Sequence, residues 1–148
     1  MENETHVHYT DADPALQQRI AAEWGEVAAR HMHFTEGFSV VALADGDPVG
    51  LISVYWRSLP PPLSETCEGY VDIIEVRPGF RRRGIARRLV EIAIERAKAH
   101  DAYQLRAWSS EDKMEAIPMW KALGFGLCPA TVAPRGQEVK GYFATKPI

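Results

Sequence analysis

The chain has 148 residues, of which 46% are hydrophobic and 25% are charged, and its formal net charge at pH 7 is −3. This composition is typical of a folded soluble domain and excludes a disordered chain. The mild acidity argues against a protein that binds nucleic acid through a broad basic surface, and the apolar stretches are too short to cross a bilayer. Residues 1–20 show no secretory signal pattern. We therefore expect a single domain over residues 1–148, located in the cytoplasm, with no membrane and no nucleic-acid partner.

The first part of the chain predicts a strand, a helix and a hairpin. Asp13 before Pro14 is typical of a helix start, with Asp13 as the N-cap and Pro14 at the first helical position. Apolar residues then recur at three- and four-residue spacing, with Gly25 as the candidate position for a bend or break. These patterns predict a strand over residues 5–10, a helix over residues 15–31, and strands over residues 38–44 and 49–56 joined by the Asp45-Gly46-Asp47 turn.

The second part predicts strands that alternate with helices. The three prolines at positions 60–62 cannot lie inside a central strand, so we expect an exposed loop there. Gly124 is the candidate C-cap of the last helix. The expected elements are a central strand over residues 70–76, a helix over 84–100, a strand over 103–108, a helix over 111–123, and a final pair of strands over 125–132 and 139–145. This order indicates an α/β fold whose sheet mixes parallel and antiparallel pairs, with a parallel strand–helix–strand unit over residues 70–108.

The segment from Val76 to Val90 carries the strongest chemical signal. Six arginines lie between Arg77 and Arg88 although the whole chain has a net charge of −3, so the positive charge is local. A strand, a turn that contains Gly84 and a helix start together make an anion site, because free N–H groups and the helix dipole face the ligand. The spacing of a P-loop and that of a dinucleotide-binding fingerprint are both missing. We expect a phosphate or pyrophosphate site here, and not merely a solvated basic face.

Residues 76–86 read Val-x-Pro-x-Phe-Arg-x-x-Gly-x-Ala, and an apolar helix pattern follows. This pattern resembles the acetyl-CoA-binding motif of the GCN5-related N-acetyltransferases (GNAT), with Arg81, Gly84 and Ala86 at the three signature positions. Residues 116–125 and the turn at residues 45–50 are also similar to segments of this family. The resemblance implies a mixed central sheet flanked by helices, with a splayed strand that binds acetyl-CoA.

The resemblance also implies which backbone groups bind the donor. The N–H groups of residues 82–87 would hold the CoA pyrophosphate. The end of the central strand would bond the pantetheine arm and polarise the thioester carbonyl, which stabilises a tetrahedral intermediate. The residues expected to bind acetyl-CoA are Ile74, Glu75, Val76, Arg81, Arg82, Arg83, Gly84, Ile85, Ala86 and Arg87.

Two carboxylates of the central strand, Asp72 and Glu75, are candidates for the general base, because the acceptor amine must lose a proton before it attacks. Strand alternation predicts that they face opposite sides of the sheet. By family resemblance, Asp72 aligns with a glutamate proposed as the base in polyamine-type members. Glu75 lies nearer the splayed end of the strand. A salt bridge to an arginine is the alternative role for either carboxylate.

The position of the family's usual acid, a tyrosine on the last helix, is occupied by Trp120. An indole N–H donates a hydrogen bond but supplies no proton at neutral pH. Lys113 likewise replaces an asparagine of the family. Three alternatives stay open: the thiolate leaves without an acid, Tyr103 or Tyr142 serves instead, or the protein binds CoA with weak chemistry.

By family resemblance, His31 and His33, followed by Phe34, lie in a region that borders the acceptor cleft. The residues expected to bind the acceptor amine are His31, Phe34, Trp56 and Trp120. We expect no metal site, because the histidine pairs of the sequence lack further ligands at suitable spacing. Cys67 and Cys128 are expected to be free thiols.

The sequence thus predicts an acetyl-CoA-dependent N-acetyltransferase that acts on a primary amine of a small molecule or peptide. The alternative is a non-catalytic acyl-CoA-binding regulatory module on the same fold. The oligomeric state stays open, with a homodimer as the commonest arrangement.

Overall fold

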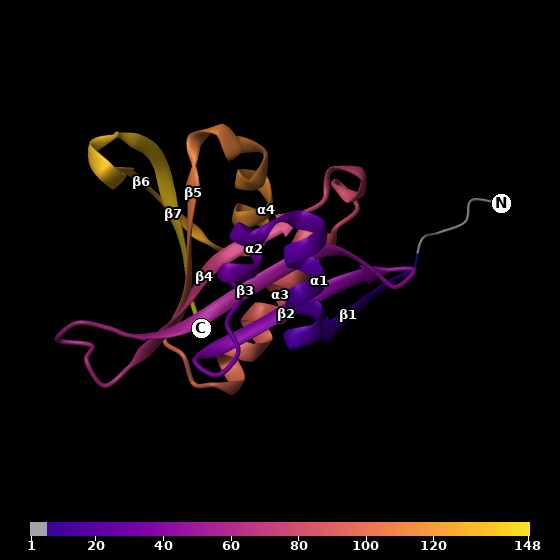
Figure 1. Cartoon of the computed structure of the whole chain (residues 1–148). Coiled ribbons are helices and arrows are strands. Elements are labelled where there is room, and N and C mark those ends of the chain that lie inside the picture. The colour runs from indigo at the N-terminus through magenta and orange to yellow at the C-terminus, as the bar shows by residue number, and fades with distance from the viewer. Residues whose placement is uncertain (1–5) are drawn as a thin grey trace. The chain divides into compact units, whose positions relative to one another are not determined.

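The computed structural model describes residues 6–148, so Thr5 of the expected first strand lies outside the described residues. The chain divides into two compact units. Figure 1 labels the helices and strands of the chain. The first unit comprises residues 1–56 and 72–93, and the second comprises residues 57–71 and 94–148. The single domain expected over the whole chain stays a prediction.

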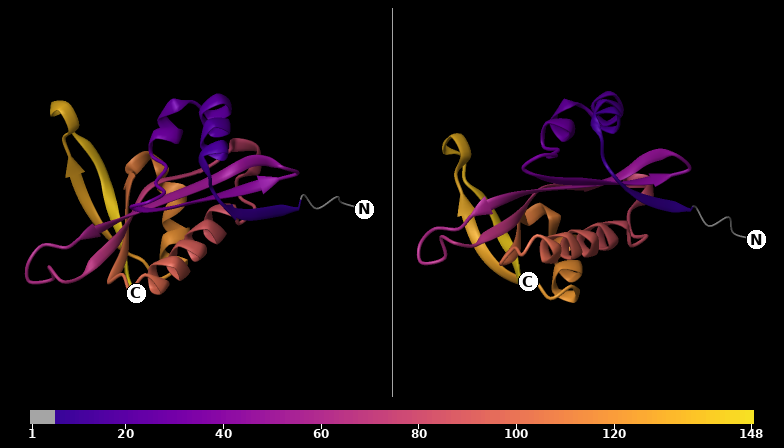
Figure 2. Two further views of the ribbon diagram at one scale, coloured as in Figure 1. Left: turned by 60° about the horizontal axis from the view of Figure 1, so that its bottom comes forward. Right: turned by 90° about the horizontal axis from the view of Figure 1, so that it is seen from below.

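The first unit contains an antiparallel sheet with helices on both of its faces (Figure 2). Its elements are β1 (Val7–Asp11), α1 (Pro14–Trp24), α2 (Glu26–Arg30), β2 (Gly37–Ala44), β3 (Asp47–Ser58) up to residue 56, β4 (Cys67–Val76) from residue 72, and α3 (Ile85–Ala99) up to residue 93. The expected hairpin is confirmed, because β2 pairs with β3 across the turn at residues 45–46.

The helix expected over residues 15–31 is two helices. α1 begins as predicted, since the Leu16 N–H donates to the Asp13 side chain at 2.8 Å. α1 ends at Trp24, and Gly25 separates it from α2. The φ angle of Gly25 is +104°, which an L side chain rarely adopts, so the chain changes direction at this glycine.

Apolar residues on both faces of the β2–β3 hairpin hold the helices in the first unit. On one face, Val41 and Leu51 pack in a buried cluster with α1 and α2; its other members are Ile20, Ala28, Ala29 and Met32. On the other face, Gly50 lies under α3: a Cβ added there would be 2.9 Å from Ile85 Cγ2 and 3.3 Å from Leu89 Cδ1. The missing side chain of Gly50 therefore permits the close approach of α3.

We expect Gly50→Ala to lower the free energy of unfolding by about 1–3 kcal/mol, because the added methyl group overpacks this contact. In open space the same change in a strand would stabilise the protein by restricting the unfolded chain. Urea denaturation measures the effect. Gly79→Ala is the matched control, since nothing lies within 4 Å of a Cβ at that position. Equal stability of the two variants would contradict the close packing at Gly50.

The second unit contains the rest of the sheet. Its elements are β4 up to residue 71, α3 from residue 94, β5 (Gln104–Ser110), a 3₁₀ helix (Glu111–Ala116), α4 (Ile117–Ala122), β6 (Gly126–Val132) and β7 (Val139–Pro147). β4 pairs with β5 in parallel, as predicted, while β7 pairs antiparallel with both β5 and β6. The strands thus follow the order β1-β2-β3-β4-β5-β7-β6, which confirms the predicted mixed sheet.

Only the second part of the helix expected over residues 111–123 is an α-helix. Lys113 has φ −101° and ψ 40°, outside helical geometry, so only residues 117–122 form α4. The chain leaves α4 at Gly124, as expected, where the Phe125 N–H donates to the Trp120 carbonyl at 2.9 Å. Among the helices within residues 6–148, none combines the length and apolar character that a membrane-spanning helix needs.

Candidate functional site

The arginine-rich turn lies entirely in the first unit, between the end of β4 and the start of α3. The Arg81 side chain folds back, and its Nε donates to the Val76 carbonyl at 3.0 Å, which ties the turn to the end of the strand. The Gly84 carbonyl accepts the Arg88 N–H at 3.0 Å, so Gly84 occupies the N-cap of α3.

The start of α3 offers backbone N–H groups to an anion. The first N–H groups of a helix have no partner inside the helix, and glycine at the N-cap has no side chain to satisfy them. Gly84 has φ +78°, and no atom lies within 4 Å of a Cβ placed there, so the space in front of the helix is open. Arg82 is also left-handed, with φ +63°, a conformation that costs a non-glycine residue about 1 kcal/mol or more. Strain of this kind concentrates at ligand sites.

The arginine side chains of this turn differ in their surroundings. Arg87 and Arg88 both approach Glu91, at 3.4 and 3.6 Å, so their charge is partly neutralised. The Arg83 guanidinium lies 5.1 Å from the centre of the Phe80 ring. Since the backbone supplies the open N–H groups, the exposed guanidinium groups add a positive field to an anion site that the main chain forms.

The two candidate bases of β4 do not face opposite sides of the sheet. The Asp72 carboxylate is hydrogen-bonded to the ring of His33, whose backbone bonds two serines on the same face of the hairpin as the α1–α2 cluster. Ile73, the next residue, packs against that cluster as well. Asp72 and Ile73 are neighbours yet lie on the same face, so the alternation of side chains is interrupted between them. Alternation counted from Ile73 places Glu75 on the face of α1 and α2 as well. The expected opposite facing is wrong, because a local irregularity in β4 cancels the alternation.

Glu75 interacts with Arg77, which follows β4 directly. Arg77 Nη1 lies 3.9 Å from Glu75 Oε1, and its guanidinium stacks 5.1 Å from the centre of the Trp24 ring at the end of α1. The Glu75 side chain is 37% exposed, compared with 26% for Asp72. Both candidate bases are thus reachable from solvent.

His33 contacts one of the two candidate bases, a role that the sequence did not indicate. Its Nε2 lies 2.8 Å from Asp72 Oδ2 and its Nδ1 lies 2.5 Å from Glu36 Oε1. Burial of the ring lowers the pKa of His33, but the hydrogen bonds to Asp72 and Glu36 outweigh it, and the pKa is raised above its ordinary value. The same bond from His33 holds the pKa of Glu36 below its ordinary value. The sequence carried no signal for the Asp72 contact, because 39 positions separate the two residues.

The expected acceptor residues have different roles. In the first unit, His31 ends α2 with its Nδ1 2.7 Å from the Val27 carbonyl, Phe34 packs against the α1–α2 cluster, and the Trp56 ring lies 5.6 Å from that of Phe38. In the second unit, Trp120 is 2% exposed and packs edge-on to Phe125, with ring centres 4.8 Å apart. Its indole N–H has no partner among the described residues.

The two tyrosines considered as alternative acids also lie in the second unit. Tyr142 is buried, and its hydroxyl lies 3.5 Å from the Lys113 carbonyl. Tyr103 is 45% exposed. Cys67 and Cys128 are free, as expected.

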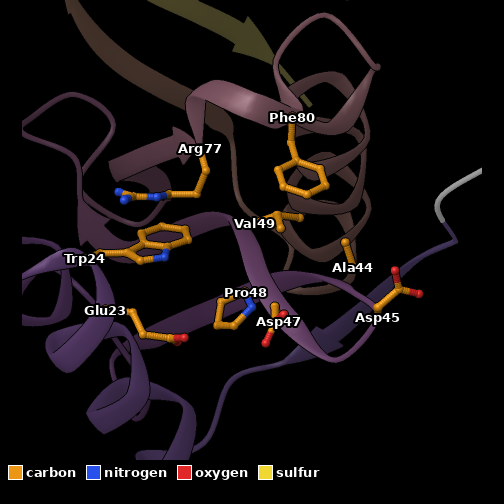
Figure 3. Close-up of a pocket in the computed structure, with 9 residues that line it drawn as sticks. All are labelled: Glu23, Trp24, Ala44, Asp45, Asp47, Pro48, Val49, Arg77 and Phe80. Carbon is orange, nitrogen blue, oxygen red and sulfur yellow. The ribbon is translucent and has the colours of Figure 1, made fainter.

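An open pocket of about 490 Å³ lies in the first unit beside the start of the arginine turn (Figure 3). Its lining residues are Glu23, Trp24, Ala44, Asp45, Asp47, Pro48, Val49, Arg77 and Phe80. Arg19 engages two of its carboxylates, Asp47 at 2.5 Å and Glu23 at 3.2 Å. The pocket therefore joins α1, the β2–β3 turn and the residues that lead into the arginine turn. Among the side chains that the structure describes, no group of three from His, Cys, Asp or Glu is arranged to hold a metal.

Residues 2–125 match the sequence model of the acetyltransferase (GNAT) family. No curated protein matches the chain in sequence. A GNAT-family acetyltransferase from Streptococcus pneumoniae has a similar structure, with TM-score 0.74 and 15% identity over 97% of this chain and 100% of that chain. NAA60 of Arabidopsis thaliana in complex with acetyl-CoA has TM-score 0.76 and 13% identity over 97% and 99% of the two chains. A GCN5-related N-acetyltransferase from Kribbella flavida has TM-score 0.71 and 21% identity over 96% and 98%. These similarities show the fold.

Proposed function

Because this chain belongs to the GNAT acetyltransferase family, we propose that it transfers the acetyl group of acetyl-CoA directly to a primary amine of a small molecule or a peptide. The observation that carries this proposal is the uncapped start of α3 at Gly84, with open space in front of it. The acetyl-CoA complex of the structurally similar NAA60 supports the identity of the donor. The acceptor class, the cytoplasmic location and a homodimer stay predictions, as does the absence of nucleic-acid and membrane partners.

The donor would be held by the backbone. The N–H groups of residues 82–87 would bind the diphosphate of CoA, where the helix dipole favours a negative group. Ile74, Glu75 and Val76 at the end of β4 would bond the pantetheine arm and direct an N–H at the thioester oxygen. A fixed N–H of this kind stabilises the oxyanion of the tetrahedral intermediate without reorganisation.

The chemistry would then need a base on the α1–α2 face of β4. Asp72 and Glu75 both lie on that face, and either would take the proton of the acceptor ammonium. His31, Phe34 and Trp56 remain the proposed acceptor-side residues. Trp120 is buried and cannot supply a proton, so we propose that the CoA thiolate leaves without a dedicated acid. A thiol with a pKa of about 8.5 is a good leaving group near neutral pH.

We expect Gly84→Val to weaken acetyl-CoA binding at least about tenfold, because the new side chain occupies the open space at the helix start and strains a left-handed residue. In the unmodified protein, acetyl-CoA at 100 times its Kd should add about 2.7 kcal/mol of stability, visible as a rise in Tm. In Gly84→Val this rise should be much smaller at the same ligand concentration.

The matched control is Gly136→Val, since Gly136 also has positive φ, +80°, and open space around a Cβ. This variant should keep the Tm rise. Equal rises in both variants would contradict the diphosphate site, and no rise in the unmodified protein would contradict the proposed function. Release of free thiol with a panel of amines separates an enzyme from a module that only binds acyl-CoA.

A further inference from the structure

Three titratable groups meet in the first unit at the start of β2. The His33 ring lies between two carboxylates, with Nε2 2.8 Å from Asp72 of β4 and Nδ1 2.5 Å from Glu36. The Tyr55 ring of β3 lies beside it, with ring centres 4.8 Å apart. The charged groups that bond the His33 ring among the described residues are these two carboxylates, so its protonation depends on them.

The number of protons in this group follows from the geometry. An ionised carboxylate only accepts hydrogen bonds, and a neutral imidazole has a single N–H to donate. Both contacts can be hydrogen bonds only when both ring nitrogens carry a proton. Loss of one proton therefore breaks the symmetry of the group: Glu36 or Asp72 then faces an unprotonated nitrogen.

The backbone holds His33 in place independently of its charge. The His33 N–H donates to Ser53 Oγ at 2.8 Å and to Ser39 Oγ at 3.0 Å, while the Ser39 hydroxyl lies 2.8 Å from the His33 carbonyl. Both serines are buried, at 0% and 3% exposure. These buried hydroxyls fix the His33 backbone, from which the ring extends, without adding a charge. The arrangement has the features of a prepared proton acceptor: a ring held by its backbone and oriented by a carboxylate.

Glu36 is the most exposed of the three side chains. The side chains of His33 and Asp72 are 18% and 26% exposed, whereas that of Glu36 is 59% exposed. Asp72 is one of the two candidate bases on the α1–α2 face of β4, and Glu36 opens to water. The hydrogen bonds thus connect the proposed reaction site to bulk solvent through His33.

We propose that His33 is a positioning residue that orients the Asp72 carboxylate and takes from it the proton of the acceptor ammonium. This inference rests on the proposed function. An N–H bond of the ammonium breaks, and its proton forms a bond to an Asp72 oxygen, which leaves the amine with a free electron pair. The Asp72 carboxyl group passes the proton to Nε2 of neutral His33, in the tautomer whose single N–H is on Nδ1 and donates to Glu36. The resulting imidazolium donates to both carboxylates and returns the proton to water on the Glu36 side.

The proposal predicts a specific pH dependence. His33 accepts the proton only when it is neutral, so kcat/KM should rise as the pH increases through the pKa of His33. Glu36 stabilises the charged ring, and its hydrogen bond is one of the causes that raise the pKa of His33. Glu36→Gln should therefore lower this pKa and move the rising limb to lower pH, by about one unit or less because Glu36 is exposed.

The experiment compares pH profiles of kcat/KM for one amine substrate in the unmodified protein, Glu36→Gln, His33→Gln and the control Glu65→Gln. Glu65 is also exposed, and it belongs to the second unit. Glu65→Gln therefore removes one exposed negative charge, as Glu36→Gln does, but outside the unit that contains His33. In Glu36→Gln, we expect the rising limb of kcat/KM at lower pH. In His33→Gln, this limb should be lost and kcat/KM should fall about tenfold or more. The profile of Glu65→Gln should be unchanged. NMR titration of the His33 ring should show the same pKa decrease in Glu36→Gln, which also reports that the variant is folded.

The outcomes separate the inference from the function on which it rests. If Glu36→Gln lowers the pKa of His33 by NMR but leaves the kcat/KM profile unchanged, His33 does not take part and the inference is overturned alone. Full activity of His33→Gln with an unchanged limb also overturns it. If the unmodified protein binds acetyl-CoA but acetylates no amine of the panel, the proposed function fails and the inference falls with it.

Discussion

Asp72→Asn is expected to lower kcat/KM for acetyl transfer by about 10²- to 10⁴-fold, the usual contribution of general acid–base catalysis. The asparagine has nearly the same shape, and its amide can still bond the His33 ring, whose Nε2 lies 2.8 Å from Asp72 Oδ2. What is lost is the ability to take a proton from the acceptor ammonium. Thiol release from acetyl-CoA in the steady state measures the effect, and the Tm rise with acetyl-CoA should be unchanged because the donor site at the start of α3 is intact.

Glu75→Gln is the matched comparison, since Glu75 is the other carboxylate on the same face of β4. It is bound only loosely, with its carboxylate 3.9 Å from Arg77. If Asp72 is the base, Glu75→Gln should retain activity within about a factor of ten. The reverse pattern would move the base to Glu75, and full activity of both variants would remove both carboxylates from the chemistry.

Glu68→Ala is expected to lower the free energy of unfolding by about 3–5 kcal/mol, the cost of removing one partner of a buried ion pair. Glu68 in β4 is 0% exposed, yet both oxygens of its carboxylate have polar partners within the second unit. Oε1 accepts from Arg106 Nη2 at 2.7 Å and lies 3.4 Å from Arg57 Nε, while Oε2 accepts from Gln104 Nε2 at 2.7 Å. The parallel pairing of β4 with β5 places Gln104 directly opposite Glu68.

The loss of this carboxylate leaves the Arg106 guanidinium without its counter-charge. The Arg106 side chain is 25% exposed, and its Nε has no hydrogen-bond partner among the described residues, so water replaces the carboxylate poorly. Urea denaturation measures the change, and the exposed Glu65→Ala should stay within about 0.5 kcal/mol of the unmodified protein. Glu68→Gln should fall between the two, because the amide oxygen still accepts a hydrogen bond. A loss below about 1 kcal/mol for Glu68→Ala would show that the network does not stabilise the second unit.

The proposed donor site follows from the sequence because its parts are contiguous. A strand, a turn with Gly84 and an amphipathic helix follow one another within residues 70–100, and a backbone site needs no contact from elsewhere in the chain. The spacing of Arg81, Gly84 and Ala86 was enough to indicate the family, which the match over residues 2–125 shows. The roles of the single residues in this site stay predictions.

The candidate base region could be predicted only in part. Asp72 and Glu75 were found as acidic residues in a central strand, but their facing was wrong because a local break in alternation leaves no mark in the sequence. Trp120 was noted as a departure from the family pattern, whereas its burial against Phe125 depends on how α4 packs in the second unit. A pattern of residue types cannot report such packing, since it has no information on which neighbours are brought together.

The sequence by itself determined the order of the elements and the mixed sheet, because local propensity and apolar spacing control these features. It also indicated where we propose the donor site, because that turn is contiguous in the chain. The tertiary structure decided what surrounds the two carboxylates of β4. His33 reaches Asp72 across 39 positions because the pairing of β2 with β3 brings Ser39 and Ser53 together, and these two serines hold the His33 backbone. Glu68 is likewise satisfied by Gln104 and Arg106 only through the parallel pairing of β4 with β5. Contacts between distant residues arise from strand pairing and packing, and a sequence read along the chain contains no measure of either.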